Sequence, residues 1–511
     1  MTDAEVQLDA VLRDHQRRLM ANWDGHEQEF LIELVRALDE TVFAFTLAPN
    51  ANELRAKDGY RHAMLQGVGA ALRPFLVQAE RVSGGIPWAP STPKLASFVD
   101  DYLYNCGTIW HLHRLAGLER FGLAQTTFTS KTKLRIEVAS ADAEAHDVAA
   151  LNTLRRRARL RRKSVDDDLA VFVPEAIRQI ASYVAIDREH FIRYDNDLTL
   201  VAYYRELAKS RATVYFESEA LPDPSIIGGM AFQGWCDDAI AASGRVLQHV
   251  AFATSLRKRH SHLVLRNLLT IFARREDVLA VLEEAGGTRE EVAQFMSAAT
   301  LTADQAAAFA ADYETPAPFY IPIARDFVLL PCFGALLNPF VGVVRYLKDQ
   351  FRTEWDRAVI GREHVFREEL RELFPSPRFV VSEGGIRLRR EDGSELTDID
   401  ASVYDRSTGA VGLFQLKWHD IYGRSTRERN SRRLNLLRAN AWVEAVATWL
   451  HRHSIAELPR ILKRRSAIVH CPYKQIASTL QPRRRNMTAH RNWVACPARP
   501  SPRFIASVFR Q

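Results

Sequence analysis

Hydrophobic positions recur at helical spacing through most of residues 1 to about 315. In the segments 29–45 and 276–285 an apolar side chain returns every three or four residues, which predicts amphipathic helices. The Ala-rich segment 301–313 opens with Thr302, a residue suited to an N-cap. The segment 126–140 instead alternates and is rich in β-branched residues, which predicts a strand pair. The front of the chain is therefore expected to be mainly α-helical.

Two breaks in this pattern divide the chain into three expected regions, 1–160, 161–350 and 351–511. The segment 155–168 (RRRARLRRKSVDDD) holds six Arg and one Lys, followed by three Asp. Such a run is more often a solvated linker or helix face than a phosphate-binding surface, and both interpretations stay open. The second break, 315–322, contains three prolines, which resist helix formation.

From about residue 355 the pattern changes to a mixture of helical and alternating segments. It predicts a helix at 355–374, strands at 379–382, 386–390, 399–404 and 411–418, a helix at 428–452 and a strand at 466–471. We interpret this as an α-β-β-β-α-β order, typical of an α/β sandwich with a mixed sheet.

Four polar residues near the end of these strands are expected to converge. Side chains alternate along a strand, so Gln415 and Lys417 share one face, and so do Asp398 and Asp400. A hairpin register with Asp400 opposite Gln415 also puts Asp398 beside Lys417. Two acids, one amide and one amine would then meet on a small patch, which a one-residue slip would destroy.

The residue types on this patch suit metal-dependent chemistry on phosphates. The Asp400 carboxylate and the Gln415 carbonyl offer oxygen ligands to a hard divalent cation such as Mg²⁺ or Mn²⁺. Lys417 could orient an attacking water or stabilise charge on the phosphate. The chain has 11 lysines against 58 arginines, and Lys417 is the only lysine between Lys348 and Lys463. Because lysine is rare in this chain, its presence at position 417 favours a specific role for Lys417.

The stretch TDIDASVYDRSTGAVGLFQLKW (397–418) resembles the aspartate strand and the Gln-x-Lys strand of the Mrr-like branch of the PD-(D/E)XK, restriction-endonuclease-like superfamily. The resemblance covers about 120 of the 511 residues. It implies a restriction-endonuclease-like fold and a magnesium-dependent endonuclease acting on DNA, with a role in prokaryotic restriction or anti-phage defence. No Pro-Asp pair precedes the acid, and Gln415 makes the site less anionic. A decayed nuclease fold that only binds nucleic acid therefore stays open as an alternative. A nuclease directed at RNA is a further alternative.

Members of this family often carry a metal-binding glutamate on the first helix, a role that the resemblance assigns to Glu363. Here Glu363 falls on the apolar stripe formed by Val359, Phe366, Leu370 and Leu373. A carboxylate on a core-facing stripe is costly unless it is paired or binds a cation.

The charge balance favours a polyanionic partner for the C-terminal region. Residues 421–511 hold 19 Lys and Arg against 3 Asp and Glu, whereas the formal net charge of residues 1–360 is −6. The excess favours nucleic-acid contact over a solvated or disordered basic tail. Arginines that follow the Gln-x-Lys strand are expected to contact the phosphates of double-stranded DNA: Arg424, Arg427, Arg429, Arg432 and Arg433.

Several other functions are disfavoured. The five cysteines form no C-x-x-C pair, which argues against structural zinc and disulfides and favours a cytoplasmic setting. The uncharged segment 327–344 is interrupted by Pro331, Gly334 and Pro339, so buried core is preferred to a membrane span. The chain lacks any Gly-Lys dipeptide and hence a Walker A motif, so ATP binding is not expected. The helical front would regulate, sense or form a homodimer.

Overall fold

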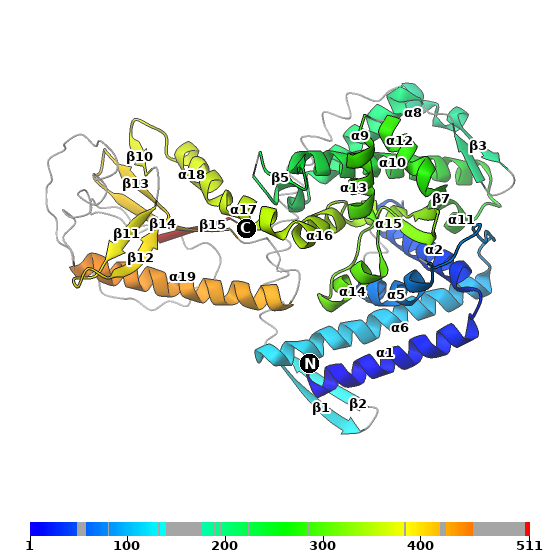
Figure 1. The fold of residues 1–511 in the computed structure, drawn as a ribbon, viewed down its shortest axis with the longest axis horizontal. Coiled ribbons are helices and arrows are strands. Elements are labelled where there is room, and N and C mark those ends of the chain that lie inside the picture. Colours follow the sequence, from blue (N-terminus) through cyan, green and yellow to red (C-terminus); the bar gives the residue numbers. More distant parts are fainter. Residues whose placement is uncertain are drawn as a thin grey trace. The chain divides into compact units, whose positions relative to one another are not determined.

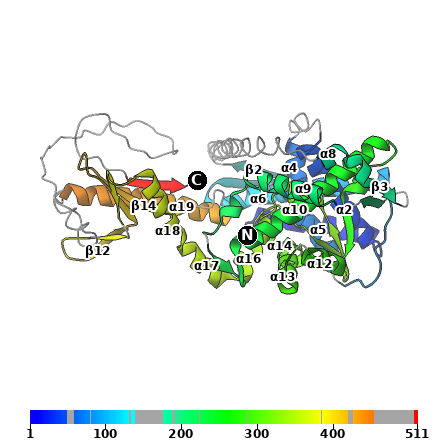
Figure 2. The same ribbon diagram turned by 90° about the horizontal axis from the view of Figure 1, so that it is seen from above.

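The computed structural model of the 511-residue chain consists of helices with several small sheets (Figure 1; Figure 2 gives the view from above). It describes residues 1–48, 58–79, 81–130, 133–138, 175–187, 191–194, 197–222, 224–284, 286–382, 385–418, 426–452 and 506–510. The chain forms two compact units, an N-terminal unit that ends at Trp355 and a C-terminal unit that starts at Asp356. The expected boundary at 160/161 lies outside the described residues.

The C-terminal unit contains a mixed four-stranded sheet. The sheet has the order β10 (Phe379–Val381), β13 (Ala401–Asp405), β14 (Val411–Trp418) and β15 (Ala506–Arg510). Strand β13 runs antiparallel to β10 and to β14, whereas β15 pairs parallel with β14. A separate hairpin joins β11 (Ile386–Arg389) to β12 (Glu395–Ile399). Helices α18 (Arg362–Leu373) and α19 (Thr426–Arg452) flank the sheet, and α17 (Arg352–Ile360) spans the boundary between the two units in the sequence.

A predominantly helical front followed by an α/β region is thus confirmed, with corrections in detail. The single helix predicted at 355–374 is wrong, because the chain forms two helices that meet at Gly361, a poor helix former. Leu373, predicted to face the core, is 66% exposed. The strand β12 was not predicted. The expected strand 466–471 lies outside the described residues.

The N-terminal unit is built largely from helices, several of which the sequence predicts. Segment 29–45 lies within α2, segment 276–285 matches α12, and Thr302 caps α14 by accepting a hydrogen bond from the Gln305 backbone N–H. The longer helices of this unit are α1 (Asp3–Asn22), α2 (Glu27–Thr46), α4 (Asp58–Gln66), α5 (Val68–Ala79), α6 (Pro93–Gly117), α9 (Leu198–Ala212), α10 (Phe232–Arg259), α12 (Arg275–Glu284), α13 (Arg289–Ala299), α14 (Ala303–Ala311) and α16 (Val341–Gln350).

Shorter elements complete this unit. They comprise the four-to-six-residue helices α8 (Glu175–Arg178), α11 (Arg266–Leu269) and α15 (Cys332–Leu337), and the 3₁₀ turns η2 (Leu118–Phe121), η3 (Ile180–Tyr183) and η4 (Phe216–Glu219). The strands are β1 (Ala124–Ser130), β2 (Lys133–Val138), β3 (Val184–Asp187), β4 (Phe191–Tyr194), β5 (Ile226–Ile227), β6 (Met230–Ala231), β7 (Ile271–Arg274), β8 (Ile321–Ala324) and β9 (Phe327–Leu330). The β1–β2 hairpin confirms the strand pair predicted at 126–140.

The uncharged segment 327–344 forms β9, α15 and the start of α16. Val328, Leu329, Phe333 and Phe340 are buried, which confirms its interpretation as protein core. Of the helices that the structure describes, none combines the length and the apolar character needed to cross a membrane.

Helix α2 lies at the centre of the N-terminal unit and packs against α5, α6, α11 and α15 (Figure 1). Its apolar residues, such as Phe30 and Leu34, are fully buried as expected for a central helix. Unusually, Glu33, Arg36 and Asp39 of the same helix are also buried. Buried ionised groups are stable only when they are paired and hydrogen-bonded. Arg36 lies 3.4 Å from Glu33 on the same helix, and further partners come from neighbouring elements.

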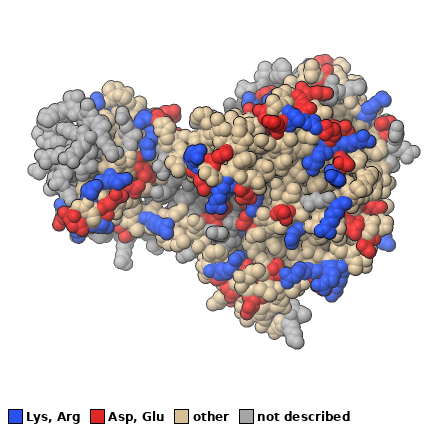
Figure 3. Space-filling view, viewed as in Figure 1, with Lys and Arg blue, Asp and Glu red and all other residues tan. Residues whose placement is uncertain are grey.

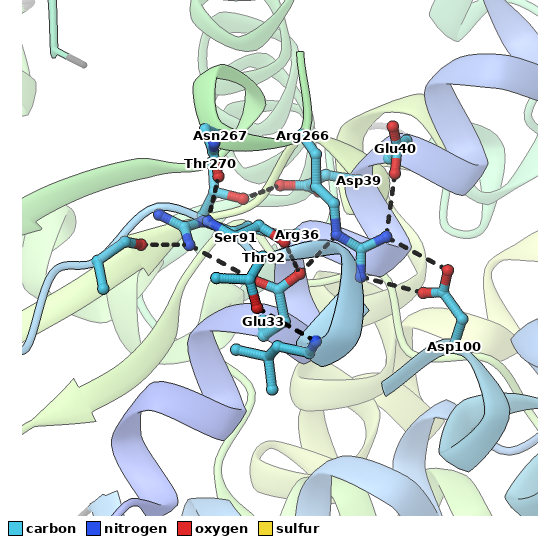
Figure 4. A network of polar contacts seen from close by, with 12 residues as sticks. Glu33, Arg36, Asp39, Glu40, Ser91, Thr92, Asp100, Arg266, Asn267 and Thr270 are labelled. Atoms are coloured by element: carbon cyan, nitrogen blue, oxygen red, sulfur yellow. Dashed lines mark hydrogen bonds and ion pairs between the residues drawn. The ribbon is translucent and has the colours of Figure 1, made fainter. Parts of the chain in front are cut away.

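The principal partner is Arg266 of α11, which is itself buried (Figure 4). Its guanidinium lies 2.6 Å from Glu33, 3.0 Å from Glu40 and 3.0 Å from Asp100 of α6. The Ser91 hydroxyl donates a further hydrogen bond to Glu33 at 2.5 Å. This buried ion network therefore joins α2, α6, α11 and the segment that precedes α6.

Two more α2 side chains extend the network. Arg36 donates to the Ala89 carbonyl at 2.8 Å, and its guanidinium lies over the rings of Trp88 and Phe272. Asp39 accepts hydrogen bonds from the Thr270 hydroxyl at 2.7 Å and the Phe333 backbone N–H at 2.8 Å (Figure 4 labels Asp39 and Thr270). Burial raises the pKa of the Asp39 carboxyl to about 7.

Arg266→Met is expected to destabilise the N-terminal unit by about 3–5 kcal/mol, because the buried Glu33 carboxylate loses its closer cation and is left with Arg36 at 3.4 Å. Native-state hydrogen exchange of the α2 amides measures this free energy separately from the C-terminal unit. The control is Arg289→Met, which removes exposed ion pairs with Glu276 and Glu283 and should change exchange far less. Equal effects of the two variants would contradict the role of the network.

Asp39→Asn is expected to gain stability relative to the wild type as the pH rises. Between its usual pKa of 3.8 and its raised pKa of about 7, Asp39 is protonated in the folded chain and ionised in the unfolded chain. Its stabilising contribution is therefore complete at low pH and falls as the pH rises, by at most about 1.4 kcal/mol per pH unit. Urea titrations of both proteins at about pH 5 and about pH 8 measure the difference, and a constant difference would contradict the prediction.

Candidate functional site

The candidate site lies on the hairpin formed by β13 and β14. Ala401 pairs with Phe414 and Tyr404 pairs with Val411. At the turn the Asp405 N–H donates to the Ala410 carbonyl at 2.9 Å. This register places Asp400 directly opposite Gln415, as the sequence predicts.

The turn that fixes this register is held by Asp405. Its carboxylate accepts two hydrogen bonds from Arg378, at 3.1 and 2.9 Å, and others from Ser407 and Thr408. The bonds from Arg378 lower the pKa of the Asp405 carboxyl. Gly409 follows with φ of +73°, a conformation that favours glycine. Turn chemistry and strand pairing therefore agree on one register.

Each face of the sheet is covered by a helix. One apolar cluster joins Phe414 and Leu416 of β14 to Phe366 and Leu370 of α18. A second cluster joins Val411 and Leu413 of β14 to Trp442, Val446 and Trp449 of α19. Because side chains alternate, Gln415 continues the α19 side of the strand. On the α19 side of β14, the apolar residues Val411 and Leu413 are therefore followed by the polar Gln415, where the site lies.

Asp400 and Gln415 form a buried polar pair. They are 7% and 4% exposed, and the Gln415 Nε2 donates to the Asp400 Oδ2 at 2.7 Å. The Leu416 backbone N–H donates to the same oxygen at 2.6 Å. Because the amide nitrogen of Gln415 must face a carboxylate, its carbonyl oxygen is turned away from that atom and is the end that could ligate a cation.

Asp398 does not join this pair, which corrects the predicted patch. The chain bends at Asp400, so β12 ends at Ile399 and β13 begins at Ala401. Asp398 therefore belongs to the β11–β12 hairpin, where it pairs with Arg387 and is exposed. The alternation that put Asp398 and Asp400 on one strand face fails because the bend interrupts the strand.

The other predicted site residues are only partly described. Glu363 is the second residue of α18, and Lys417 follows Gln415 by two residues in β14, but their side chains lie outside the described atoms. Helix α19 begins at Thr426, two residues before the predicted start, and contains four of the predicted arginines. Arg424 and the side chains of the other four lie outside the described part of the chain: Arg427, Arg429, Arg432 and Arg433.

Three hydrogen-bond donors in or near the site were missed from the sequence. The Leu416 N–H is a backbone donor, which no residue pattern reveals. Trp442 and Trp449 donate their indole N–H groups to backbone carbonyls of the β11–β12 hairpin. Their spacing of seven residues on one helix is the signal that could have identified them as a pair on the core face.

The described donors suit a hard divalent cation that keeps most of its waters. One carboxylate and one amide carbonyl match Mg²⁺, which proteins often bind through one or two carboxylates plus water and substrate phosphate. Within the described residues no group of three or more His, Cys, Asp or Glu side chains gathers around a common point.

Comparison with protein-family models, curated proteins and solved structures finds no match for this chain.

Gln415→Glu is expected to make the thermal midpoint depend on Mg²⁺. It places two carboxylates within hydrogen-bonding distance of each other, which destabilises the fold until a divalent cation lies between them. The matched control is Gln233→Glu, because Gln233 donates a similar hydrogen bond to Asp237 at 3.0 Å on the exposed surface. Thermal unfolding with chelator and with Mg²⁺ gives the comparison. The same Mg²⁺ shift in both variants would contradict a cation site at Asp400.

Proposed function

We propose that the C-terminal unit is a divalent-metal-dependent endonuclease that hydrolyses DNA. The observation that carries this proposal is the Asp400–Gln415 pair, joined at 2.7 Å and buried on adjacent antiparallel strands. A pair of apolar side chains at these positions would usually be at least as stabilising. Polar groups retained at such a cost are typical of functional sites.

The arrangement around this pair supports a restriction-endonuclease-like fold. A helix covers each face of the sheet, and the strand after α19 pairs parallel with β14, so the sheet is mixed. This agrees with the fold that the Asp…Gln-x-Lys resemblance implies. A role in prokaryotic restriction or anti-phage defence is part of the same proposal and rests on that resemblance.

Each residue of the site has a distinct proposed role. Asp400 and the Gln415 carbonyl, with Glu363, would hold Mg²⁺ or Mn²⁺, which when bound acidifies water and offsets charge on the phosphate. The N–H groups of Gln415 and Leu416 hold the Asp400 carboxylate in a fixed orientation. Lys417 would orient the attacking water or stabilise the negative charge that develops on the phosphate.

The distribution of charge supports DNA contact by the C-terminal region. Residues 361–511 carry 28 Lys and Arg against 15 Asp and Glu, whereas the formal net charge of residues 1–360 is −6. On the face seen in Figure 3, acidic and basic side chains lie interspersed over the N-terminal unit. Electrostatic attraction to a phosphate backbone is therefore expected mainly from the C-terminal region, including the arginines of α19.

A second candidate function is nucleic-acid binding without cleavage. Its basis is Gln415 itself, a neutral residue where an acid would give a stronger cation site. Both candidates predict salt-dependent DNA binding, so only a cleavage assay separates them.

Asp400→Asn and Lys417→Ala are each expected to lower the rate of DNA cleavage by about 100-fold or more, because each removes a group that stabilises the transition state. The measurement is cleavage of plasmid DNA by the whole chain with Mg²⁺, Mn²⁺ or chelator, run beside an RNA substrate. Cleavage of RNA alone would redirect the proposal to an RNA nuclease. Binding without cleavage in either metal would favour the second candidate.

The control is Asp398→Asn, which changes a neighbouring acid that is exposed and lies on the separate hairpin. This variant should cut DNA at close to the wild-type rate. Lys417→Ala that cuts as fast as the wild type, with unchanged metal dependence, would overturn the assignment of the site.

A further inference from the structure

Helix α19 holds the β11–β12 hairpin through two indole groups. The Trp442 Nε1 donates to the Asp398 carbonyl at 2.8 Å, and the Trp449 Nε1 donates to the Arg389 carbonyl at 2.8 Å. The two tryptophans are 7% and 6% exposed and belong to the same apolar cluster. Buried indole N–H groups require an acceptor, so both bonds fix backbone positions on the hairpin.

The two bonds differ in their distance from Asp400 along the chain. Asp398 precedes Asp400 by two residues and lies just before the bend that separates β12 from β13. Arg389 lies at the end of β11, on the other strand of the hairpin. Only the Trp442 bond therefore holds the backbone that leads directly into Asp400.

Beyond the bend, the Asp400 carboxylate is bound by the N–H groups of Gln415 and Leu416 on β14. The Asp400 N–H also donates to the Phe414 carbonyl at 3.0 Å, so β14 holds the side chain and backbone of Asp400 while α19 holds the backbone that precedes it. The Asp400 carboxylate and the Trp442 indole are both buried, and a lost hydrogen bond would leave either of them unpaired.

We propose that Trp442 is a positioning residue for Asp400. Its indole N–H fixes the Asp398 carbonyl and thereby the bend that directs the Asp400 carboxylate onto Gln415 and Leu416. The catalytic consequence rests on the proposed nuclease function, since it needs Asp400 to act on a bound cation. The structural consequence, a fixed Asp400 carboxylate, does not depend on that function.

Trp442 also packs against Leu388, Ile399 and Val411, so its ring and its N–H must be separated. Trp442→Phe keeps an aromatic ring in the cluster and removes the donor. Replacement of Trp442 by benzothienylalanine keeps the full bicyclic shape and also removes the donor, which covers the case in which Trp442→Phe folds poorly. Trp449→Phe is the matched control, because it removes an indole bond of the same length from the same cluster.

The first experiment is hydrogen–deuterium exchange of the whole chain, read at the peptide that spans β14. The Leu416 amide donates to Asp400, so its exchange reports whether the carboxylate stays in place. Removal of the Trp442 donor should speed exchange at this peptide by roughly tenfold, and Trp449→Phe should leave it nearly unchanged. Equal exchange in the two variants overturns the positioning role, whether or not the protein cuts DNA.

The second experiment is steady-state cleavage of plasmid DNA with Mg²⁺. Loss of the Trp442 donor should lower kcat by roughly 10- to 100-fold with little change in KM, because a misplaced catalytic group affects the reaction step more than binding. Trp449→Phe should keep a kcat close to that of the wild type. An equal loss of kcat in both variants overturns the inference. A wild-type protein that does not cut refutes the proposed function instead, and the exchange experiment then decides the positioning role alone.

Discussion

The buried guanidinium of Arg266 is the constraint on which the N-terminal unit depends. A cation in a protein interior is stable only if carboxylates surround it in good geometry, and Glu33, Glu40 and Asp100 provide them from two different helices. Any rearrangement of α2, α6 or α11 that separates these groups leaves a charge buried without a partner. The apolar contacts of α2 make the unit compact, whereas this network specifies which neighbours α2 has and at what rotation about its axis.

The C-terminal unit also contains a buried group, the Asp400 carboxylate, that needs partners in good geometry. Asp400 is buried beside an apolar sheet face, and neutral N–H donors from Gln415 and Leu416 bind it. Orientation is therefore imposed by β14, whose own register is fixed by the Asp405 turn and by apolar clusters on both faces. If Asp400 ligates a cation, much of its preorganisation comes from the hairpin rather than from the cation.

Local features of the fold could be predicted from the sequence where a short pattern determines them. The Thr302 cap, the helices 29–45 and 276–285, and the hairpin register between Asp400 and Gln415 all follow from neighbouring residues. The bend at Asp400 and the break at Gly361 were missed because alternation and periodicity describe regular segments and not where they stop.

The buried network could not be predicted, for a different physical reason. Glu33, Arg36 and Glu40 are spaced three and four residues apart on α2, which is also the pattern of a solvated helix face. The burial of Glu33 and Arg36 depends on contacts with residues that are distant in the sequence, such as Arg266, and nothing local distinguishes the two cases. For Lys417 and Glu363 only the backbone is described, so their roles remain predictions from the sequence pattern.

The long sequence separation within the network has a consequence for synthesis on the ribosome. Glu33 and Arg266 are 233 residues apart, and Asp39 and Phe333 are 294 apart. At a translation rate of about 5–20 residues per second, these partners are synthesised roughly 10–60 s after α2. During that time its apolar and charged side chains lack their final environment, so the nascent N-terminal unit exposes an aggregation-prone helix. We therefore expect chaperones to bind this segment during translation. A protein whose core forms from adjacent helices would depend less on such binding.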